Sequence, residues 1–322
     1  MLLFVRWSAL LISLLLLAAC TTEDGLTERS TGQALGDGPV LNIAHRGAAG
    51  KAPENTLAAY DLALEHGADY IEQDVRMTKD SVLVVFHDES LGRATRGAEE
   101  SCTGPLREKT LAQLRTCDVG TPFNDKYPRY AREEYKGQKI PTLEEVFRRY
   151  RQRANFYIDI KSPQETPEVE EKLLRLMKEY GLLEPADSWR ALVVSFEEDS
   201  LRELHELAPT LPLMQAYHAE ETDDSILAAL DATQEYAVGI NPWKDNVSTR
   251  LVEAAHARCL YIHPYTANNK PEMEQLISAD VDGVFTKFPG RLEEVLDEGS
   301  MNADSTTGLA PEKRASCRTK DS

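Results

Sequence analysis

The chain has 322 residues, with 54 Asp and Glu against 36 Lys and Arg, and a formal net charge of −18. So acidic a chain is a poor partner for nucleic acid, because binding to the phosphate backbone depends on clustered Lys and Arg. The charge also disfavours a broad contact with an anionic membrane surface, but it leaves room for one phosphate in a local basic pocket. The length suits one large α/β domain with a full core.

Residues 1–19 are predicted to be a targeting signal. The segment is apolar apart from Arg6 and a few small polar residues, and it is too short to read as a stable membrane span. It ends in Leu17-Ala18-Ala19-Cys20, and small residues before a cysteine resemble the lipobox of bacterial lipoproteins. We therefore expect lipidation of Cys20, with a plain secretory signal as the alternative. Residues 20–38 are polar and are expected to form a flexible tether.

A lipid on Cys20 implies a place in the bacterial cell envelope, in the periplasm or at the outer membrane, with membrane contact through the lipid alone. The other cysteines fit such an oxidising compartment. Cys102 and Cys117 lie in one loop-rich segment and could form a disulfide, whereas Cys259 opens an apolar run and is expected to be a buried thiol. No Cys/His spacing suggests a zinc site.

Apolar runs that predict strands alternate with amphipathic runs that predict helices. The expected strands span residues 40–45, 70–76, 82–87, 155–161, 191–196, 213–217, 237–241, 260–263 and 283–286. The expected helices span residues 57–65, 143–150, 167–180, 199–207, 224–231, 248–257, 271–278 and 291–297. This alternation predicts a distorted TIM (β/α)8 barrel over residues 39–299. An open doubly wound sheet is the alternative, but no GxGxxG opens a helix after a strand.

Two segments depart from a regular barrel. The link between the second and third strands, at residues 77–81, is too short for a parallel crossover and predicts a tight turn. Residues 89–139 are turn-rich and without periodicity, so we expect an insertion after the third strand that lies over the face carrying the chemistry. Residues 300–322 are polar and are expected to be a disordered tail.

Charged side chains lie at the ends of the first two long strands. The first strand ends in His45 and Arg46, at a glycine-containing turn that lets a backbone approach an anion closely. Glu72 and Asp74 are two residues apart on a strand, so they point to the same side. Two crowded carboxylates suit a hard cation such as Ca²⁺ or Mg²⁺, although a solvent-facing acidic pair is the alternative.

Two further strand ends carry reactive groups. The third strand ends in His87, and a histidine there can serve as general acid or base. Asp159 and Lys161 share one face of a strand, and a charge pair at a buried strand end is costly unless it binds something. Four such strand ends together are hard to explain by packing. Between them, either Asn55 or Thr56 is expected to cap the helix that follows the first strand.

These spaced motifs resemble the glycerophosphodiester phosphodiesterase family, and most of all its longer periplasmic type. The resemblance extends over residues 40–296 and rests on motifs in a fixed order: His45-Arg46-Gly47, Pro53-Glu54-Asn55-Thr56, residues 67–75, 77–80, 84–88, 140–145, 194–196, 263–266 and 282–286. It implies a distorted barrel and a metal-dependent hydrolase. The products would be sn-glycerol 3-phosphate and an alcohol such as choline, ethanolamine or glycerol.

The resemblance also implies roles for single residues. The general acid–base pair would be His45 and His87, and the phosphate would be bound by Arg46 and Lys161. Ca²⁺ or Mg²⁺ would be coordinated by Glu72, Asp74, Asp159 and Glu54. The nucleophile in the family's proposed mechanism is the substrate's own 2-hydroxyl, which gives a cyclic phosphate that water then opens.

Two positions differ from the family pattern: Asp159 stands where the family usually has Glu, and Lys287 stands where it usually has Asp. Tyr265 and Trp243 are candidates to line the substrate pocket, or else are plain core or rim aromatics. Two other functions stay open, namely a lysophospholipase D-like activity on lipids and a lipid-anchored binding barrel without catalysis. The presence of both histidines and the carboxylates favours the phosphodiesterase.

Overall fold

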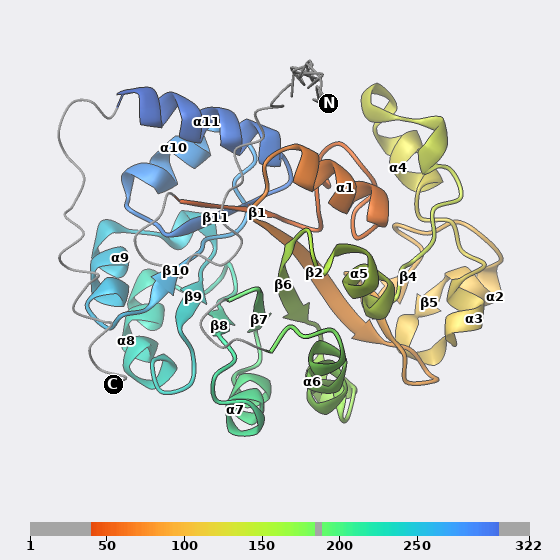
Figure 1. Cartoon of the computed structure of the whole chain (residues 1–322), viewed down its shortest axis with the longest axis horizontal. Helices are drawn as coiled ribbons and strands as arrows, with labels where there is room; N and C mark the ends of the chain where they lie inside the picture. Colours follow the sequence, from red (N-terminus) through yellow and green to blue (C-terminus); the bar gives the residue numbers. More distant parts are fainter. Residues whose placement is uncertain (1–39, 184–188, 303–322) are drawn as a thin grey trace, which may run out of the picture. The chain divides into compact units, whose positions relative to one another are not determined.

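Parallel strands form a nearly closed barrel in the computed structural model, which describes residues 40–183 and 189–302 (Figure 1). The strand order is β10-β9-β8-β7-β6-β2-β1-β11. Backbone bonds from Asp282 N to Ile262 O and from Phe285 N to Pro264 O, both 3.0 Å, bring β11 beside β10. The barrel strands are β1 (Leu41–Ala44), β2 (Tyr70–Met77), β6 (Asn155–Ile160), β7 (Ala191–Ser195), β8 (Leu213–Ala216), β9 (Gly239–Asn241), β10 (Tyr261–Ile262) and β11 (Gly283–Thr286).

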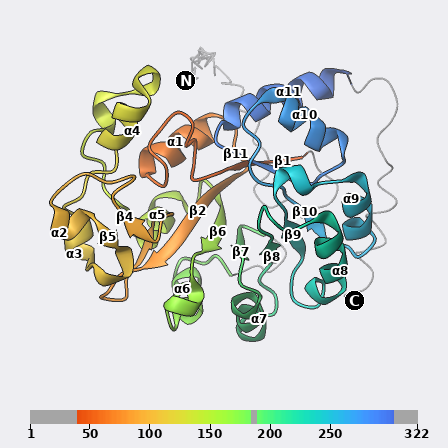
Figure 2. The same cartoon turned by 180° about the vertical axis from the view of Figure 1, so that it is seen from behind.

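Helices follow the strands and cover the outside of the barrel (Figures 1 and 2). They are α1 (Leu57–Glu65), α5 (Leu143–Tyr150), α6 (Val169–Glu179), α7 (Glu198–Leu207), α8 (Asp223–Thr233), α9 (Thr249–His256), α10 (Lys270–Ser278) and α11 (Pro289–Asn302). The predicted (β/α)8 architecture is therefore confirmed. Among the residues that the structure describes, no helix is both long enough and apolar enough to cross a membrane. The predicted signal segment, Cys20 and the tether lie outside the described residues.

The tight turn expected after the second strand is confirmed. β3 (Leu83–Val85) pairs antiparallel with β2, with Val85 opposite Val75 and Leu83 opposite Met77. The turn closes through a bond from Ser81 N to Thr78 O of 2.9 Å. β3 is shorter than the predicted strand: Phe86 N still bonds across to Asp74 O in the same register at 2.9 Å, and the chain leaves the sheet after it. His87 therefore lies in a loop rather than on a strand.

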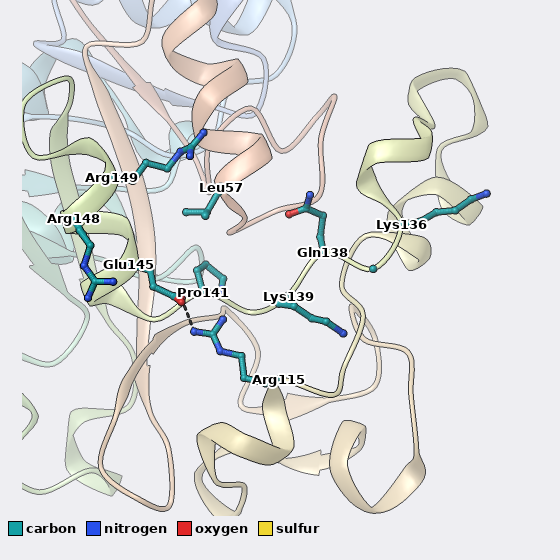
Figure 3. A pocket seen from close by; sticks show the side chains of 10 residues that line it. Leu57, Arg115, Lys136, Gln138, Lys139, Pro141, Glu145, Arg148 and Arg149 are labelled. Atoms are coloured by element: carbon teal, nitrogen blue, oxygen red, sulfur yellow. Dashed lines mark hydrogen bonds and ion pairs between the residues drawn. The ribbon is translucent and has the colours of Figure 1, made fainter.

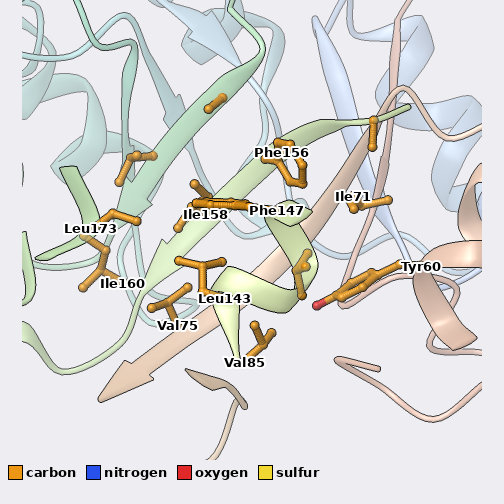
Figure 4. Close-up of a cluster of buried hydrophobic side chains, with 14 of the residues drawn as sticks. Tyr60, Ile71, Val75, Val85, Leu143, Phe147, Phe156, Ile158, Ile160 and Leu173 are labelled. Atoms are coloured by element: carbon orange, nitrogen blue, oxygen red, sulfur yellow. The ribbon is translucent and has the colours of Figure 1, made fainter. Parts of the chain in front are cut away.

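Helix α5 illustrates how the outer layer is built. It begins at a capping box, in which Thr142 and Glu145 satisfy each other's backbone N–H groups. Its buried residues Leu143, Val146, Phe147 and Tyr150 recur with helical spacing. Leu143 and Phe147 lie over the strands (Figure 4). Phe147 packs edge-on against Phe156 of β6, with ring centroids 5.0 Å apart. Each such buried side chain contributes roughly 1.5–3 kcal/mol.

A second apolar cluster fills the inside of the barrel. It draws residues from six of the eight barrel strands, β1, β2, β6, β7, β8 and β11: Ile43, Tyr70, Tyr157, Leu192, Val194, Met214, Ala216 and Phe285. Because strand side chains alternate, the residues two positions further along the same strands also face inward. Those residues are His45 after β1, Glu72 on β2 and Asp159 on β6. The charged side chains therefore lie at the carboxyl ends of the strands, one layer beyond the apolar cluster that fills the barrel.

The insertion contains short elements and lies beside α5 and β2, away from α8 and α9 (Figures 1 and 2). Its own apolar cluster includes Leu91, Leu106, Leu114 and Val119. The elements are β4 (Ser90–Leu91), α2 (Glu99–Cys102), β5 (Gly104–Pro105), α3 (Leu111–Leu114), α4 (Thr121–Lys126) and the 3₁₀ turns η1 (Leu106–Glu108), η2 (Pro128–Tyr130) and η3 (Glu133–Tyr135).

Disulfides reinforce the fold. Cys102 and Cys117, the pair singled out from the sequence, are joined, with an S–S distance of 2.09 Å and Cα atoms 5.5 Å apart. Cys259 is disulfide-bonded as well, so the expectation of a buried free thiol was wrong. An apolar run beside a cysteine indicates burial, but it does not reveal whether a second cysteine comes within reach.

Candidate active site

The turn after β1 has a strained backbone that aims His45 and Arg46 at the barrel mouth. Arg46 and Gly47 both adopt positive φ, at 57° and 74°. Gly47 packs so closely on α1 that a Cβ there would lie 2.7 Å from the backbone carbonyl carbon of Ala59. A side chain at this position would therefore push the turn away from the helix.

The two capping candidates have separate roles. Thr56 caps α1, because its hydroxyl accepts a bond from Ala59 N at 3.2 Å. Asn55 instead has a positive φ of 57° and donates from its side-chain amide to Asp74 Oδ2 at 2.7 Å. The hydroxyl of Tyr60 donates to Asn55 Oδ1 at 3.1 Å and fixes the orientation of the amide. The loop after β1 thereby positions a carboxylate of β2.

Three carboxylates from β2 and β6 converge. The register sets Asp74 opposite Asp159, and Glu72 lies two residues before Asp74 on the same side of β2. One oxygen of each lies within 4.8 Å of the others, and all three side chains are buried. Within the described part of the chain, one oxygen of Asp74 and one of Asp159 accept no hydrogen bond. Buried carboxylates that converge in this way are the donors that Ca²⁺ and Mg²⁺ prefer, so these residues fit such a cation.

Two cations share the carboxylate group. Arg46 donates its backbone N–H to Glu72 Oε2 at 2.5 Å, and its Nε lies 3.2 Å from Asp74 Oδ2. Lys161 Nζ contacts Asp159 and lies 3.1 Å from Asp74 Oδ1. Arg46 and Lys161 therefore lie on opposite oxygens of Asp74. A phosphate bound here would meet both side chains.

The pKa values of two of these buried carboxylates shift in opposite directions. Burial, followed by the negative charges of Asp74 and Asp159, raises the pKa of Glu72 well above its ordinary value. Burial acts on Asp74 in the same direction, yet Lys161 and Arg46 hold the pKa of Asp74 well below its ordinary value. Without a further positive charge, Glu72 thus tends to retain a proton while Asp74 stays ionised.

The two histidines stand in different surroundings. His45 is partly buried at the mouth, its Nδ1 lies 3.2 Å from Thr266 Oγ1, and burial followed by the charge of Arg46 lowers its pKa well below the ordinary value. His87 is more exposed, and its Nδ1 lies 2.8 Å from Asp88 Oδ1. The side chain of Arg76 donates to the carbonyl of His87 at 2.9 Å and anchors this loop to β2.

Glu54 lies beside Arg46 rather than among the three carboxylates. Its Oε1 is 3.4 Å from Arg46 Nη1, and it also pairs with Arg93 of the insertion. Burial acts to raise the pKa of Glu54, but Arg46 and Arg93 lower it. Its place in a metal shell stays a prediction.

Aromatic side chains lie at the other side of the mouth. Trp243 and Tyr265 pack with ring centroids 5.5 Å apart, and Tyr265 in turn packs on Phe196 at 5.9 Å. The Phe196 ring also lies 5.4 Å from Lys161 Nζ, which links the aromatic row to the charged group. Tyr265 is thus connected to the charged group through Phe196, and Trp243 lies one ring further away, so their roles in the pocket stay predictions.

Lys287 adds a positive charge to the mouth. It is half-buried, and burial followed by the charge of Arg46 lowers its pKa. Its charge also acts on His45. The departure from the family pattern at this position therefore lies next to the predicted catalytic residues.

Sequence patterns did not reveal three contributors to the site. Asn55 was read only as a possible helix cap, Thr266 lies 221 residues from the histidine that it contacts, and Arg93 lies in the aperiodic insertion. The charge of Arg93, five residues after Asp88, was the single signal available for it. Each contact depends on how a loop folds back, which local periodicity does not encode.

A separate cleft of about 580 Å³ lies between α1, α5 and the end of the insertion (Figure 3). Basic residues line much of it, but most of them already pair with acids. Arg115 binds Glu145 at 2.5 Å, and Lys136 binds Glu133 at 2.6 Å. Arg148 and Arg149 pair with Glu144 and Asp61. This cleft contains none of the predicted catalytic residues, and we assign it no anion site.

Comparison with known proteins agrees with this geometry. Residues 45–291 match the glycerophosphoryl diester phosphodiesterase family. A glycerophosphodiester phosphodiesterase of Bacillus subtilis is 39% identical over 267 residues, which is 83% of this chain and 89% of that protein. Another, from Caldanaerobacter subterraneus, is 34% identical over 80% of this chain and 98% of that protein.

Solved structures are similar as well. A glycerophosphodiester phosphodiesterase of Agrobacterium tumefaciens is 28% identical, with a TM-score of 0.62, over 79% of this chain and 99% of that one. A phosphodiesterase of Oleispira antarctica in complex with the product sn-glycerol 3-phosphate is 25% identical, with a TM-score of 0.68. That alignment covers 80% of this chain and 97% of the other.

Proposed function

The chain belongs to the glycerophosphoryl diester phosphodiesterase family, and from that premise we propose that it cleaves glycerophosphodiesters with His45 and His87 as the acid–base pair and a divalent cation at Glu72, Asp74 and Asp159. The products are sn-glycerol 3-phosphate and an alcohol. The observation that carries the proposal is the convergence of three buried carboxylates within 4.8 Å of one another, beside Arg46 and Lys161.

The chain's own residues supply binding and proton transfer. Arg46 and Lys161 neutralise the charge of the phosphodiester, which otherwise repels a nucleophile. One histidine accepts the proton of the glycerol 2-hydroxyl as its oxygen bonds to phosphorus. The other donates a proton to the leaving alkoxide as its P–O bond breaks. Burial keeps the ring of His45 neutral, which favours it as the base in this first step.

In the second step water opens the cyclic phosphate, and the histidines exchange roles. Ca²⁺ or Mg²⁺, when bound, supplies positive charge to the non-bridging oxygens. Asp159 is one methylene shorter than the usual Glu, yet its oxygen lies with those of Glu72 and Asp74. This supports Asp159 as a ligand.

The test is an assay of purified residues 39–322 on glycerophosphocholine. We expect release of glycerol 3-phosphate with Ca²⁺ or Mg²⁺ and its loss in EDTA. His45→Ala and His87→Ala should each lower kcat about 10²–10⁴-fold. His205→Ala, on the outer helix α7, is the control and should leave the rate unchanged. Near-normal rates for either active-site variant would refute the mechanism.

The same assay separates the alternatives. Glycerophosphodiesters with choline, ethanolamine and glycerol should all be cleaved, whereas lysophospholipids should react poorly. Preferential cleavage of lysophospholipids would favour the lysophospholipase D-like activity. Lack of any hydrolysis with either metal would favour a binding barrel.

We also propose a periplasmic-type enzyme that is lipid-anchored through Cys20 in the bacterial cell envelope, on the strength of the small residues before that cysteine. The full chain expressed in a bacterium should incorporate labelled palmitate and sediment with membranes. Cys20→Ser should abolish both. Retention of label in that variant would overturn the assignment.

A further inference from the structure

Arg93, near the start of the insertion, touches two acidic residues of the barrel mouth. Its Nε lies 2.5 Å from Asp88 Oδ2, and its Nη2 lies 3.0 Å from Asp88 Oδ1. The same Nη2 contacts Glu54 Oε1, and Nη1 lies 3.5 Å from Glu54 Oε2. The guanidinium therefore bridges the loop after β1 and the loop after β3.

Each of these acids in turn contacts a residue of the predicted machinery. Asp88 Oδ1 lies 2.8 Å from Nδ1 of His87, and Glu54 Oε1 lies 3.4 Å from Nη1 of Arg46. Arg93 is thus one contact away from a proposed acid–base residue and one contact away from a proposed phosphate ligand. The side chains of Asp88 and Glu54 are 22% and 23% exposed, and that of Arg93 is 48% exposed.

The contact with Asp88 fixes geometry as well as charge. A guanidinium that meets both oxygens of a carboxylate sets the plane of that carboxylate. Asp88 can then accept the Nδ1–H of His87, which leaves Nε2 as the free nitrogen for proton exchange with a substrate. Burial opposes ionisation of Asp88, but the bonds to His87 and Arg93 keep its pKa well below the ordinary value.

We propose that Arg93 is a positioning residue, through which the insertion fixes the Asp88–His87 pair for proton transfer. The inference rests on the proposed role of His87. It also gives the insertion a part in the reaction: a displaced insertion removes Arg93 from both acids at once. Arg93 itself does not touch the reacting atoms.

The first test compares Arg93→Ala with Arg96→Ala. Arg96 lies on the same segment and forms an exposed ion pair with Asp125 at 2.8 Å, so it controls for the loss of a surface guanidinium. We expect Arg93→Ala to lower kcat about 10–100-fold with KM changed less than about threefold, as for loss of a charged hydrogen bond. Arg96→Ala should keep the wild-type rate. Arg93→Lys should recover part of the loss, since lysine keeps the charge but cannot contact both oxygens of Asp88 as a planar guanidinium does.

A double-mutant cycle with Asp88→Asn separates positioning from general damage. If Arg93 acts through Asp88, adding Arg93→Ala to Asp88→Asn should cost less than about threefold. Independent, multiplicative losses, or an effect on KM alone, would overturn the inference. If Arg93→Ala folds poorly by circular dichroism, the cycle with Arg93→Lys gives the same decision.

The two proposals fail in different ways. Full activity of Arg93→Ala together with an inactive His87→Ala removes the positioning role and leaves the mechanism intact. Full activity of His87→Ala removes the mechanism itself, and the inference with it.

Discussion

The two sides of the barrel mouth differ in the charge and the hydrogen bonding of their buried polar side chains. On the side of β1, β2 and β6, Glu72, Asp74 and Asp159 crowd charges of one sign and leave carboxylate oxygens without hydrogen bonds. On the side of β9 and β10, Asn241 donates to the carbonyl of His263 at 2.7 Å and accepts from the hydroxyl of Tyr157 at 3.0 Å. On the neutral side these groups bond one another, although Nε2 of His263 has no hydrogen-bond partner among the described residues, whereas the charged side brings three carboxylates together.

This difference distinguishes a site from a structural network. Neutral groups that bond one another stabilise the fold and have little left to offer a ligand. Like charges that share a buried space are costly until a ligand of opposite charge enters. Mutations on the charged side should therefore affect activity first, and those on the neutral side should affect stability first.

The largest effect is expected for Asp74→Asn. Asp74 is the acid that both Arg46 and Lys161 contact, so its loss should lower kcat/KM about 10³-fold, or about 4 kcal/mol. Asn241→Ala is the matched change on the neutral side. It should lower the free energy of unfolding by about 1–3 kcal/mol while kcat/KM stays within about tenfold. Initial rates and thermal unfolding measure both, and equal losses of activity would break the comparison.

The insertion lies beside the charged side, and its local stability should depend on its disulfide. Replacing Cys102 and Cys117 with Ser removes a bond that spans 15 residues, worth about 3 kcal/mol in the chain-entropy account. We expect faster proteolysis within residues 89–139, with smaller loss of stability in the barrel. Mass spectrometry of limited digests locates the cuts. Cleavage mainly in the barrel would contradict this expectation.

On the neutral side, His263 should make stability fall in acid. Burial lowers its pKa from 6.5 to about 4, so the unfolded chain binds a proton that the folded chain does not. Stability contributed in this way is present above pH 6.5 and is lost as the pH falls toward 4. Between pH 7 and 5.5 the loss is about 1 kcal/mol. In denaturant unfolding, the free energy of unfolding of His263→Gln should fall less between pH 7 and 5.5 than that of the wild type. An equal fall in both proteins would contradict the role of His263.

The smallest effect is expected for Trp243→Ala. If this ring lines the pocket for the alcohol, KM for glycerophosphocholine should rise about two- to tenfold with kcat nearly unchanged. Leu207→Ala, which removes an exposed apolar side chain from α7, is the control. An unchanged KM would leave Trp243 as a rim aromatic.

Much of the barrel followed from local pattern. All nine predicted strands are present, and helices α1 and α5 span the predicted residues. Errors fell at strand ends, as at residues 86–87, where the chain leaves the sheet soon after the last bond across to β2, from Phe86 N to Asp74 O. The pairing of Glu72 with Asp74 and of Asp159 with Lys161 followed from alternation alone, since residues two apart on a strand share a side.

The order and type of the charged residues, and hence the family and its chemistry, were determined by the sequence itself. Only the tertiary structure decided which groups meet: the register set Asp74 beside Asp159, the folded loop sent Asn55 to Asp74 while Thr56 capped α1, and the insertion brought Arg93 to Glu54 and Asp88. Alternation acts within one strand, whereas these contacts join segments up to tens of residues apart. Their geometry depends on strand register and loop closure, which no local pattern specifies.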